Sequence, residues 1–198
     1  MQDFIKKHFG NEFVKNVLTL FSGSFLAQLI PLLILPVLTR LYSTEVFAIF
    51  FIYSSIVMVL SVLSTLQMEL AIVLPSNRKD AVNVLILSII ISIVVSLVLL
   101  VIIIFFSKEI SILIGEKGIE NWLFFVPISI FFLGIFQSFN YWCNRVKDYK
   151  SISYTKVCKS VSAASSQVSA GLMPTNNFGM IGGMLIGQFF SASFITFR

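Results

Sequence analysis

Three ionisable residues lie within stretches that are otherwise apolar, and these side chains are the best placed in the chain for chemistry. Glu69 precedes Pro75 by more than one helical turn and sits in a long apolar run. Lys156 and Lys159 precede an uncharged run, 160–173, that is too short to cross a bilayer without them. An ionisable group at the middle of a bilayer costs about 2.5–3.5 kcal/mol on insertion scales, so each of these residues indicates pairing, binding or coupling.

Glu69 has two interpretations. A carboxylate at this depth fits a gate or an ion-coupling group. It equally fits one half of a structural ion pair, with Lys15 or Arg78 as the cation.

Lys156 and Lys159 share a helical face with Ala163 and Gln167, because residues three and four apart lie on one side of a helix. This face is polar and does not resemble a surface that contacts lipid. One interpretation is that the lysines extend along their apolar stems to the cytoplasmic headgroups. The other is that they form a basic cavity mouth for an anionic substrate.

The spacing of charge along the chain indicates which elements hold these residues. Long stretches without a charged residue are separated by short charged breaks, and the last stretch is divided at Pro174. A hydrocarbon core about 30 Å thick needs roughly 20 apolar residues in a helix, and open strands cannot satisfy their backbone in lipid. We therefore expect an all-α integral membrane protein with six transmembrane helices, at about 14–39, 46–74, 81–107, 121–143, 153–173 and 178–197.

The composition supports a membrane protein. The chain is 57% hydrophobic and 12% charged, whereas soluble domains are about 25% charged. The net charge of +5 is scattered through the breaks, so nucleic acid is not an expected partner.

Groups that carry enzyme chemistry are missing from the pattern. The sequence has one histidine, His8, and its two cysteines, Cys143 and Cys158, have no zinc or disulfide spacing. No Ser/His/Asp set, phosphate-binding loop or dinucleotide fingerprint is present. We expect no enzyme activity, no catalytic residues, no cofactor and no metal site.

The distribution of Lys and Arg orients the expected helices. With the N-terminus in the cytoplasm, most positive residues fall on the cytoplasmic side, and Arg40, Lys108 and Lys117 are left outside. This arrangement follows the positive-inside rule and places both chain ends in the cytoplasm. The segment 1–13 is then a cytoplasmic tail or an in-plane amphipathic helix, since Phe9 and Phe13 continue a four-residue apolar period.

Small residues predict that the fifth and sixth helices pack together. A repeat of small residues at every fourth position lets two helix backbones approach closely in a membrane. The residues with this spacing are Gly179, Gly183, Gly187, Ser162, Ser166 and Ala170.

Two prolines lie inside the first expected helix. Pro31 and Pro36 each remove a backbone hydrogen bond and crowd the preceding turn. They fit a static bend or a hinge that moves during transport.

Four motifs carry a resemblance to a known family. They are Pro31-x-x-x-x-Pro36-Val-Leu-Thr-Arg40-Leu-Tyr42-Ser, Leu66-Gln-Met-Glu69-Leu-Ala-Ile-Val-Leu-Pro75, Tyr141-Trp142-x-x-Arg145 and Phe178-Gly-x-Ile-Gly-Gly-x-Leu-Ile-Gly187-Gln. With the Ser/Gly-rich fifth helix, they resemble the bacterial oligosaccharide-lipid flippases of O-antigen and capsule synthesis. These flippases belong to the exporter superfamily that includes the MATE drug antiporters. Ala48 departs from the pattern, because such proteins commonly have Gly there.

The resemblance implies a fold of two facing six-helix lobes, of which 14–198 corresponds to the N-terminal lobe. A single lobe cannot enclose a central cavity, so we expect a fragment or truncated product, or else pairing with a second lobe. The implied function is to flip undecaprenyl-pyrophosphate-linked oligosaccharides across the bacterial inner membrane by alternating access, in polysaccharide and lipopolysaccharide biosynthesis. The implied partners are the lipid-linked oligosaccharide, membrane lipids, a polysaccharide polymerase and a chain-length regulator.

The resemblance also implies roles for individual residues. The candidates for binding the phosphates are Arg40, Arg145, Lys156 and Lys159. Gln167, on the same polar face as the two lysines, is a further candidate for substrate binding. Glu69 becomes the gating or ion-coupling carboxylate.

Other functions remain alternatives. A MATE-type drug or cation antiporter usually has a carboxylate in its first helix, and 16–39 has none. A lipid II flippase is expected to carry arginines within its first two spans, where this chain has only Arg40. A membrane glycosyltransferase needs acidic clusters near the headgroups, whereas Asp80 and Asp148 stand in separate loops. A structural membrane subunit is the last alternative.

Overall fold

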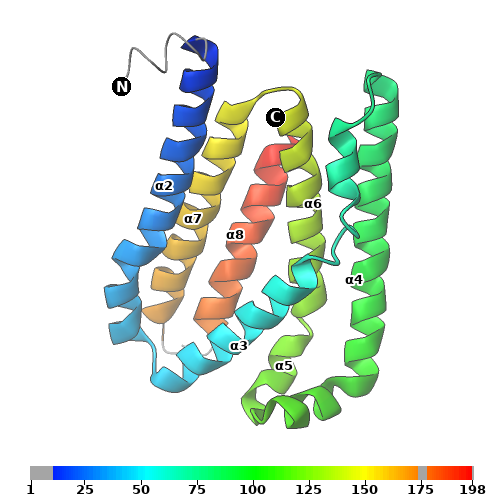
Figure 1. The fold of residues 1–198 in the computed structure, drawn as a ribbon. Coiled ribbons are helices and arrows are strands. Elements are labelled where there is room, and N and C mark those ends of the chain that lie inside the picture. The colour runs from blue at the N-terminus through cyan, green and yellow to red at the C-terminus, as the bar shows by residue number, and fades with distance from the viewer. Residues whose placement is uncertain (1–10, 174–177, 198) are drawn as a thin grey trace.

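The computed structural model describes residues 11–173 and 178–197, and its regular elements in these ranges are all helices (Figure 1). The α-helices are α2 Asn11–Leu41, α3 Thr44–Ser61, α4 Arg78–Ile114, α5 Glu120–Leu123, α6 Val126–Arg145, α7 Tyr149–Gly171 and α8 Gly179–Thr196. Two short 3₁₀ helices are η1 Met68–Val73 and η2 Lys117–Ile119. The tail or in-plane helix expected in 1–13 falls mostly outside the described residues, and 11–13 belong to α2.

Long helices lie side by side in the order α2, α7, α8, α6 and α4, and α3 crosses this row obliquely (Figure 1). Each helix packs most extensively on its neighbours in that row. The start of α2 and the end of α8 lie at the same end of the bundle, which we call the terminal end. The corner between α2 and α3 and the segment η2–α5 lie at the opposite end.

In the described residues, five segments are long and apolar enough to cross a membrane. They are Val14–Leu41, Thr44–Ser61, Arg78–Ile114, Glu120–Arg145 and Gly179–Thr196. The helix α7 is not among them. It nevertheless lies between α2 and α8 for much of its length (Figure 1).

The second expected helix, 46–74, is divided in the structure. The α-helix ends at Ser61, and η1 follows after a series of turns. Leu66 and Gln67 have φ angles of 50° and 60°. A left-handed conformation costs roughly 1–2 kcal/mol for a residue with a side chain, so this break is held by its surroundings and not by local preference.

The neighbouring expected helices also differ in their bounds. The helix expected at 121–143 is divided after Leu123, and α6 begins again with Pro127 in its first turn, where a proline needs no amide hydrogen. The helix expected at 81–107 is longer, because α4 continues to Ile114 and ends where Gly115 takes a φ of 79°.

The predicted packing of the last two helices is confirmed, and of the three small residues expected on α7 it is Ala170 that takes part: a Cβ added at Gly179 would lie 2.9 Å from Ala170 Cβ. A Cβ added at Gly183 would lie 2.5 Å from Gln167 Cγ, and one at Gly187 would lie 2.7 Å from Ala163 Cβ. Ala163 and Gln167, and not Ser162 and Ser166, therefore complete the α7 face that packs on the glycines. Ser162 donates its hydroxyl hydrogen to Cys158 O in its own helix at 2.6 Å.

Hydroxyl groups of α7 bind backbone carbonyls of α2. Ser153 donates to Thr19 O at 2.8 Å, and Ser160 donates to Ala27 O at 2.7 Å. Pro31 has no N–H to donate to the carbonyl four residues earlier, which is that of Ala27. Ser160 therefore replaces the hydrogen bond that Pro31 removes, as the lipid interior requires.

The replacement of a backbone hydrogen bond by the Ser160 hydroxyl predicts the stability of a double mutant. Ser160→Ala leaves the Ala27 carbonyl without a donor and lowers the free energy of unfolding by about 1–3 kcal/mol. Pro31→Ala restores a helical N–H, so adding it to Ser160→Ala recovers most of that loss. Thermal unfolding in nanodiscs measures both effects, and Ser162→Ala, whose hydroxyl binds its own helix, is the near-neutral control. Equal stability of the single and double variants would contradict the pairing.

Candidate functional site

A cavity of about 440 Å³ lies between α2, α6 and α7, and we call it the lysine cavity. This volume is within the range of small-molecule sites, roughly 300–1,000 Å³. Its lining residues are Ser24, Ala27, Gln28, Pro31, Phe136, Lys156, Lys159, Ser160, Ala163, Ala164 and Gln167.

The two lysines of this cavity have neutral partners. The Lys156 ammonium donates to Ser24 Oγ at 3.0 Å. The Lys159 ammonium lies 5.4 Å from the ring centroid of Phe136, within the distance of a cation–π contact. Among the described lining residues none is acidic. The cavity therefore holds two positive charges that no lining carboxylate neutralises, and it is suited to an anion.

Close helix contacts place these lysines. A Cβ added at Gly187 would lie 2.9 Å from Lys159 O, so α8 approaches the α7 backbone directly beside the lysine. On the other side, a Cβ added at Gly23 would overlap Ser153, which brings α2 equally near. The lysine positions on α7 are thus fixed from both flanks.

Gln167 is held at the far end of the same stripe. Its amide nitrogen donates to Met180 O at 3.1 Å, and its backbone carbonyl accepts from the Tyr42 hydroxyl at 2.6 Å. Tyr42 lies at the corner between α2 and α3, and burial raises the pKa of its phenol. The phenol therefore stays a neutral donor at ordinary pH and ties this corner to α7.

The structure brings together three of the five residues predicted to bind substrate. Lys156, Lys159 and Gln167 all line the lysine cavity. Arg40 lies in the last turn of α2 with an exposed side chain, at the end of the bundle away from the chain ends. Arg145 does not line this cavity.

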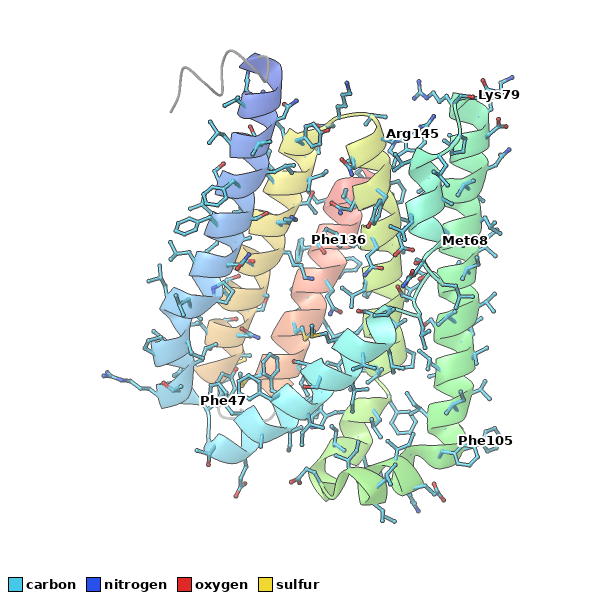
Figure 2. The ribbon with its side chains drawn as sticks, in the orientation of Figure 1. Phe47, Met68, Lys79, Phe105, Phe136 and Arg145 are labelled. Carbon is cyan, nitrogen blue, oxygen red and sulfur yellow. The ribbon has the colours of Figure 1, made fainter. Side chains whose placement is uncertain are left out.

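Arg145 lies at the terminal end of α6, beside the connection between η1 and α4 (Figure 2). Its guanidinium donates to the carbonyls of Ile72 at 3.1 Å and Val73 at 3.2 Å. It also reaches Ser76 O at 3.5 Å and Asn77 O at 3.4 Å. This cation therefore binds carbonyls at the end of η1 and at the turn that precedes α4, an arrangement that suits the five donors of arginine.

The two predicted hinge prolines lie inside one continuous helix, α2. Pro31 lines the lysine cavity, whereas Pro36 does not and is exposed. A bend at Pro31 would change the shape of the cavity directly.

Glu69 lies at the broken second helix and is only 8% exposed. Its carboxylate accepts a hydrogen bond from the Thr65 hydroxyl, and in the described part of the chain no Lys or Arg pairs with it. The ion pair with Lys15 or Arg78 that the sequence suggested is therefore not formed. The preceding residue, Met68, is half-buried and lies beside α4 (Figure 2).

Hydroxyl and amide groups surround the same break. Ser64 is fully buried and its hydroxyl lies 3.2 Å from Gln137 Oε1 on α6. Ser88 on α4 and Ser138 on α6 share a hydrogen bond of 2.7 Å. Left-handed residues, a buried carboxylate and buried hydroxyls thus meet where a helix is interrupted, which is typical of functional sites in transporters.

Sequence reasoning missed several residues of these sites. Ser24 and Gln28 precede Pro31 on one face of α2, and this spacing was the available signal for a wet surface there. Phe136 gave no signal, since aromatic residues are frequent in the chain. Outside these sites, Gln188 is 1% exposed, and its amide has no hydrogen-bond partner in the described residues.

Residues 13–197 match the family model described as polysaccharide biosynthesis protein. No curated protein and no solved structure matches the chain. The family match covers the lysine cavity, the broken second helix around Glu69 and the helices that build both.

The surroundings of Glu69 predict different results for two substitutions. Glu69→Gln keeps an oxygen that accepts from Thr65, so the thermal stability in nanodiscs stays near that of the unmodified protein. Glu69→Ala leaves the buried Thr65 hydroxyl unpaired and lowers the free energy of unfolding by about 1–3 kcal/mol. If Glu69→Gln is as unstable as Glu69→Ala, the fold needs the negative charge and a cationic partner must exist.

Proposed function

The chain belongs to the polysaccharide biosynthesis protein family, and we propose that it forms a six-helix lobe of a lipid-linked oligosaccharide flippase. The cargo is an oligosaccharide joined to undecaprenyl pyrophosphate, and it moves from the inner to the outer leaflet of the bacterial inner membrane. Hydrated sugars and a pyrophosphate cannot cross hydrocarbon unaided, so the protein must replace their water.

The observation that carries this proposal is the uncompensated charge of the lysine cavity. Lys156 and Lys159 lie three residues apart on a helix between two other helices, with no acidic residue among the described lining. Such a charge pair is costly without an anion. A pyrophosphate supplies several strong acceptor oxygens, and Gln167 and Ser24 add polar groups to the same wall.

The topology of the proposal has six membrane crossings. The five apolar helices are joined by α7, which crosses as a polar helix covered by α2 and α8. Both ends of the described chain lie at one end of the bundle, as six crossings require. By the positive-inside rule, that end faces the cytoplasm.

Alternating access needs parts that move. Pro31 lines the lysine cavity and Glu69 lies at a broken helix, so we assign hinge motion to the first and gating or ion coupling to the second. A second lobe, within a longer chain or from another copy, supplies the opposite wall of the transport path.

A MATE-type antiporter is the second candidate, because a buried carboxylate at an interrupted helix suits proton or sodium coupling. The lysine cavity argues against a cationic cargo, since two ammonium groups repel it.

Charge removal in the lysine cavity tests the function. In a strain without its own oligosaccharide-lipid flippase, we expect Lys156→Gln with Lys159→Gln to lower glycan export by about tenfold or more, which corresponds to 1.4 kcal/mol. The charge-conserving Lys156→Arg with Lys159→Arg retains export. Lys150→Gln, an exposed lysine on the same helix, is the control.

The measured quantity is surface glycan per molecule of protein in the membrane. Full export by the double glutamine variant would remove the lysine cavity from the transport path.

A further inference from the structure

We propose that a second cavity, at the end of the bundle opposite the terminal end, binds the uncharged sugar units of the cargo. This inference rests on the proposed function for its class of ligand, and it adds a site that neither the motifs nor the family match identifies. The cavity has a volume of about 420 Å³, and we call it the aromatic cavity.

Three separate parts of the chain build this cavity. The start of α3 contributes Ser43 and Glu45, the segment η2–α5 contributes Asn121 and Trp122, and the start of α8 contributes Phe178. These parts converge at the end where Phe47 is labelled (Figure 2).

The aromatic side chains form one wall. The Trp122 and Phe178 rings lie 4.8 Å apart between centroids at an interplanar angle of 58°. Trp122 is 8% exposed and therefore fixed, whereas Phe178 is 64% exposed and presents its ring to a ligand. Sugar rings carry faces of C–H groups with partial positive charge, and these faces pack against the electron-rich face of an aromatic ring.

The polar side chains of the cavity suit hydroxyl groups. Glu45 offers carboxylate oxygens that accept from sugar hydroxyls, and Asn121 and Ser43 can both donate and accept. All three side chains are exposed. This combination of acceptors, donors and an apolar wall fits a ligand that has many hydroxyls and apolar ring faces.

The charge of the cavity separates it from the lysine cavity. Its described lining contains the Glu45 carboxylate and neither Lys nor Arg. A carboxylate repels a phosphate, so this cavity disfavours the part of the cargo that the lysine cavity attracts. The lysine cavity therefore suits the charged linkage of the cargo, and the aromatic cavity suits its neutral sugars.

Local contacts keep the aromatic cavity in shape. Ser43 caps α3 by accepting from the Val46 amide at 3.5 Å. The Gly118 amide donates to Glu116 Oε1 at 3.2 Å, and a Cβ at Gly118 would lie 2.9 Å from Ile49 Cδ1. A preformed cavity loses less entropy when it binds a ligand.

Trp122 provides a direct measurement of binding. The chain has two tryptophans, so Trp142→Phe leaves Trp122 as the only indole. The full chain in nanodiscs is titrated with neutral tri- to pentasaccharides built from hexoses and N-acetylhexosamines. We expect a saturable change in Trp122 fluorescence at millimolar concentration or below, and no such change with inorganic pyrophosphate.

Variants at the cavity and at matched positions decide the result. Glu45→Ala and Phe178→Ala should each raise the Kd at least fivefold. Glu109→Ala and Phe105→Ala, exposed residues of α4 outside the cavity, should leave it unchanged. The inference is overturned if no oligosaccharide gives a saturable change, if the control variants weaken binding equally, or if the signal follows lipid headgroup composition instead of sugar.

The outcome separates this inference from the proposed function. If no sugar binds but the lysine variants lose export, only the role of the aromatic cavity is ruled out. If sugars bind but the lysine variants export normally, the lysine cavity is not the pyrophosphate site.

Discussion

The structure depends on the burial of a helix that is too polar to cross a membrane by itself. The helix α7 lies between α2 and α8, and it is not one of the apolar segments of the described chain. Its hydroxyls reach carbonyls of α2, and Gln167 reaches a carbonyl of α8. In hydrocarbon each unsatisfied polar group costs several kcal/mol, so these contacts are a condition of the fold.

The contacts that bury α7 also position its charges. Ser160 compensates for Pro31, and both line the lysine cavity with Lys156 and Lys159. Motion of α2 at Pro31 would therefore change a backbone contact and the position of the ammonium groups together. The broken second helix adds Glu69, which is buried beside a hydroxyl and not a cation. We infer that the lobe keeps its ionisable groups in separate places, with an anion site and a coupling group on different helices.

Much of this arrangement follows from the sequence, because length and hydropathy determine where helices cross a membrane. The family was predicted from four motifs, the pairing of the last two helices from the spacing of small residues, and the grouping of Lys156 with Lys159 and Gln167 from helical periodicity. The break after Ser61 was not, since nothing in 62–67 is a proline or a glycine and the left-handed residues there are held by tertiary contacts. The partners of Arg145 were hidden for the same reason: they are backbone carbonyls near residue 72, exposed only because η1 ends there.

The most direct test asks whether α7 crosses the membrane. In a chain with Cys143→Ala and Cys158→Ala, single cysteines are placed before α7 with Lys147→Cys and after it with Met173→Cys, and intact cells are treated with a membrane-impermeant maleimide. Our account predicts labelling at position 173 and protection at 147 until the membrane is permeabilised. Equal accessibility of the two positions would place both ends of α7 on one side and would contradict the fold in the membrane and the proposed site.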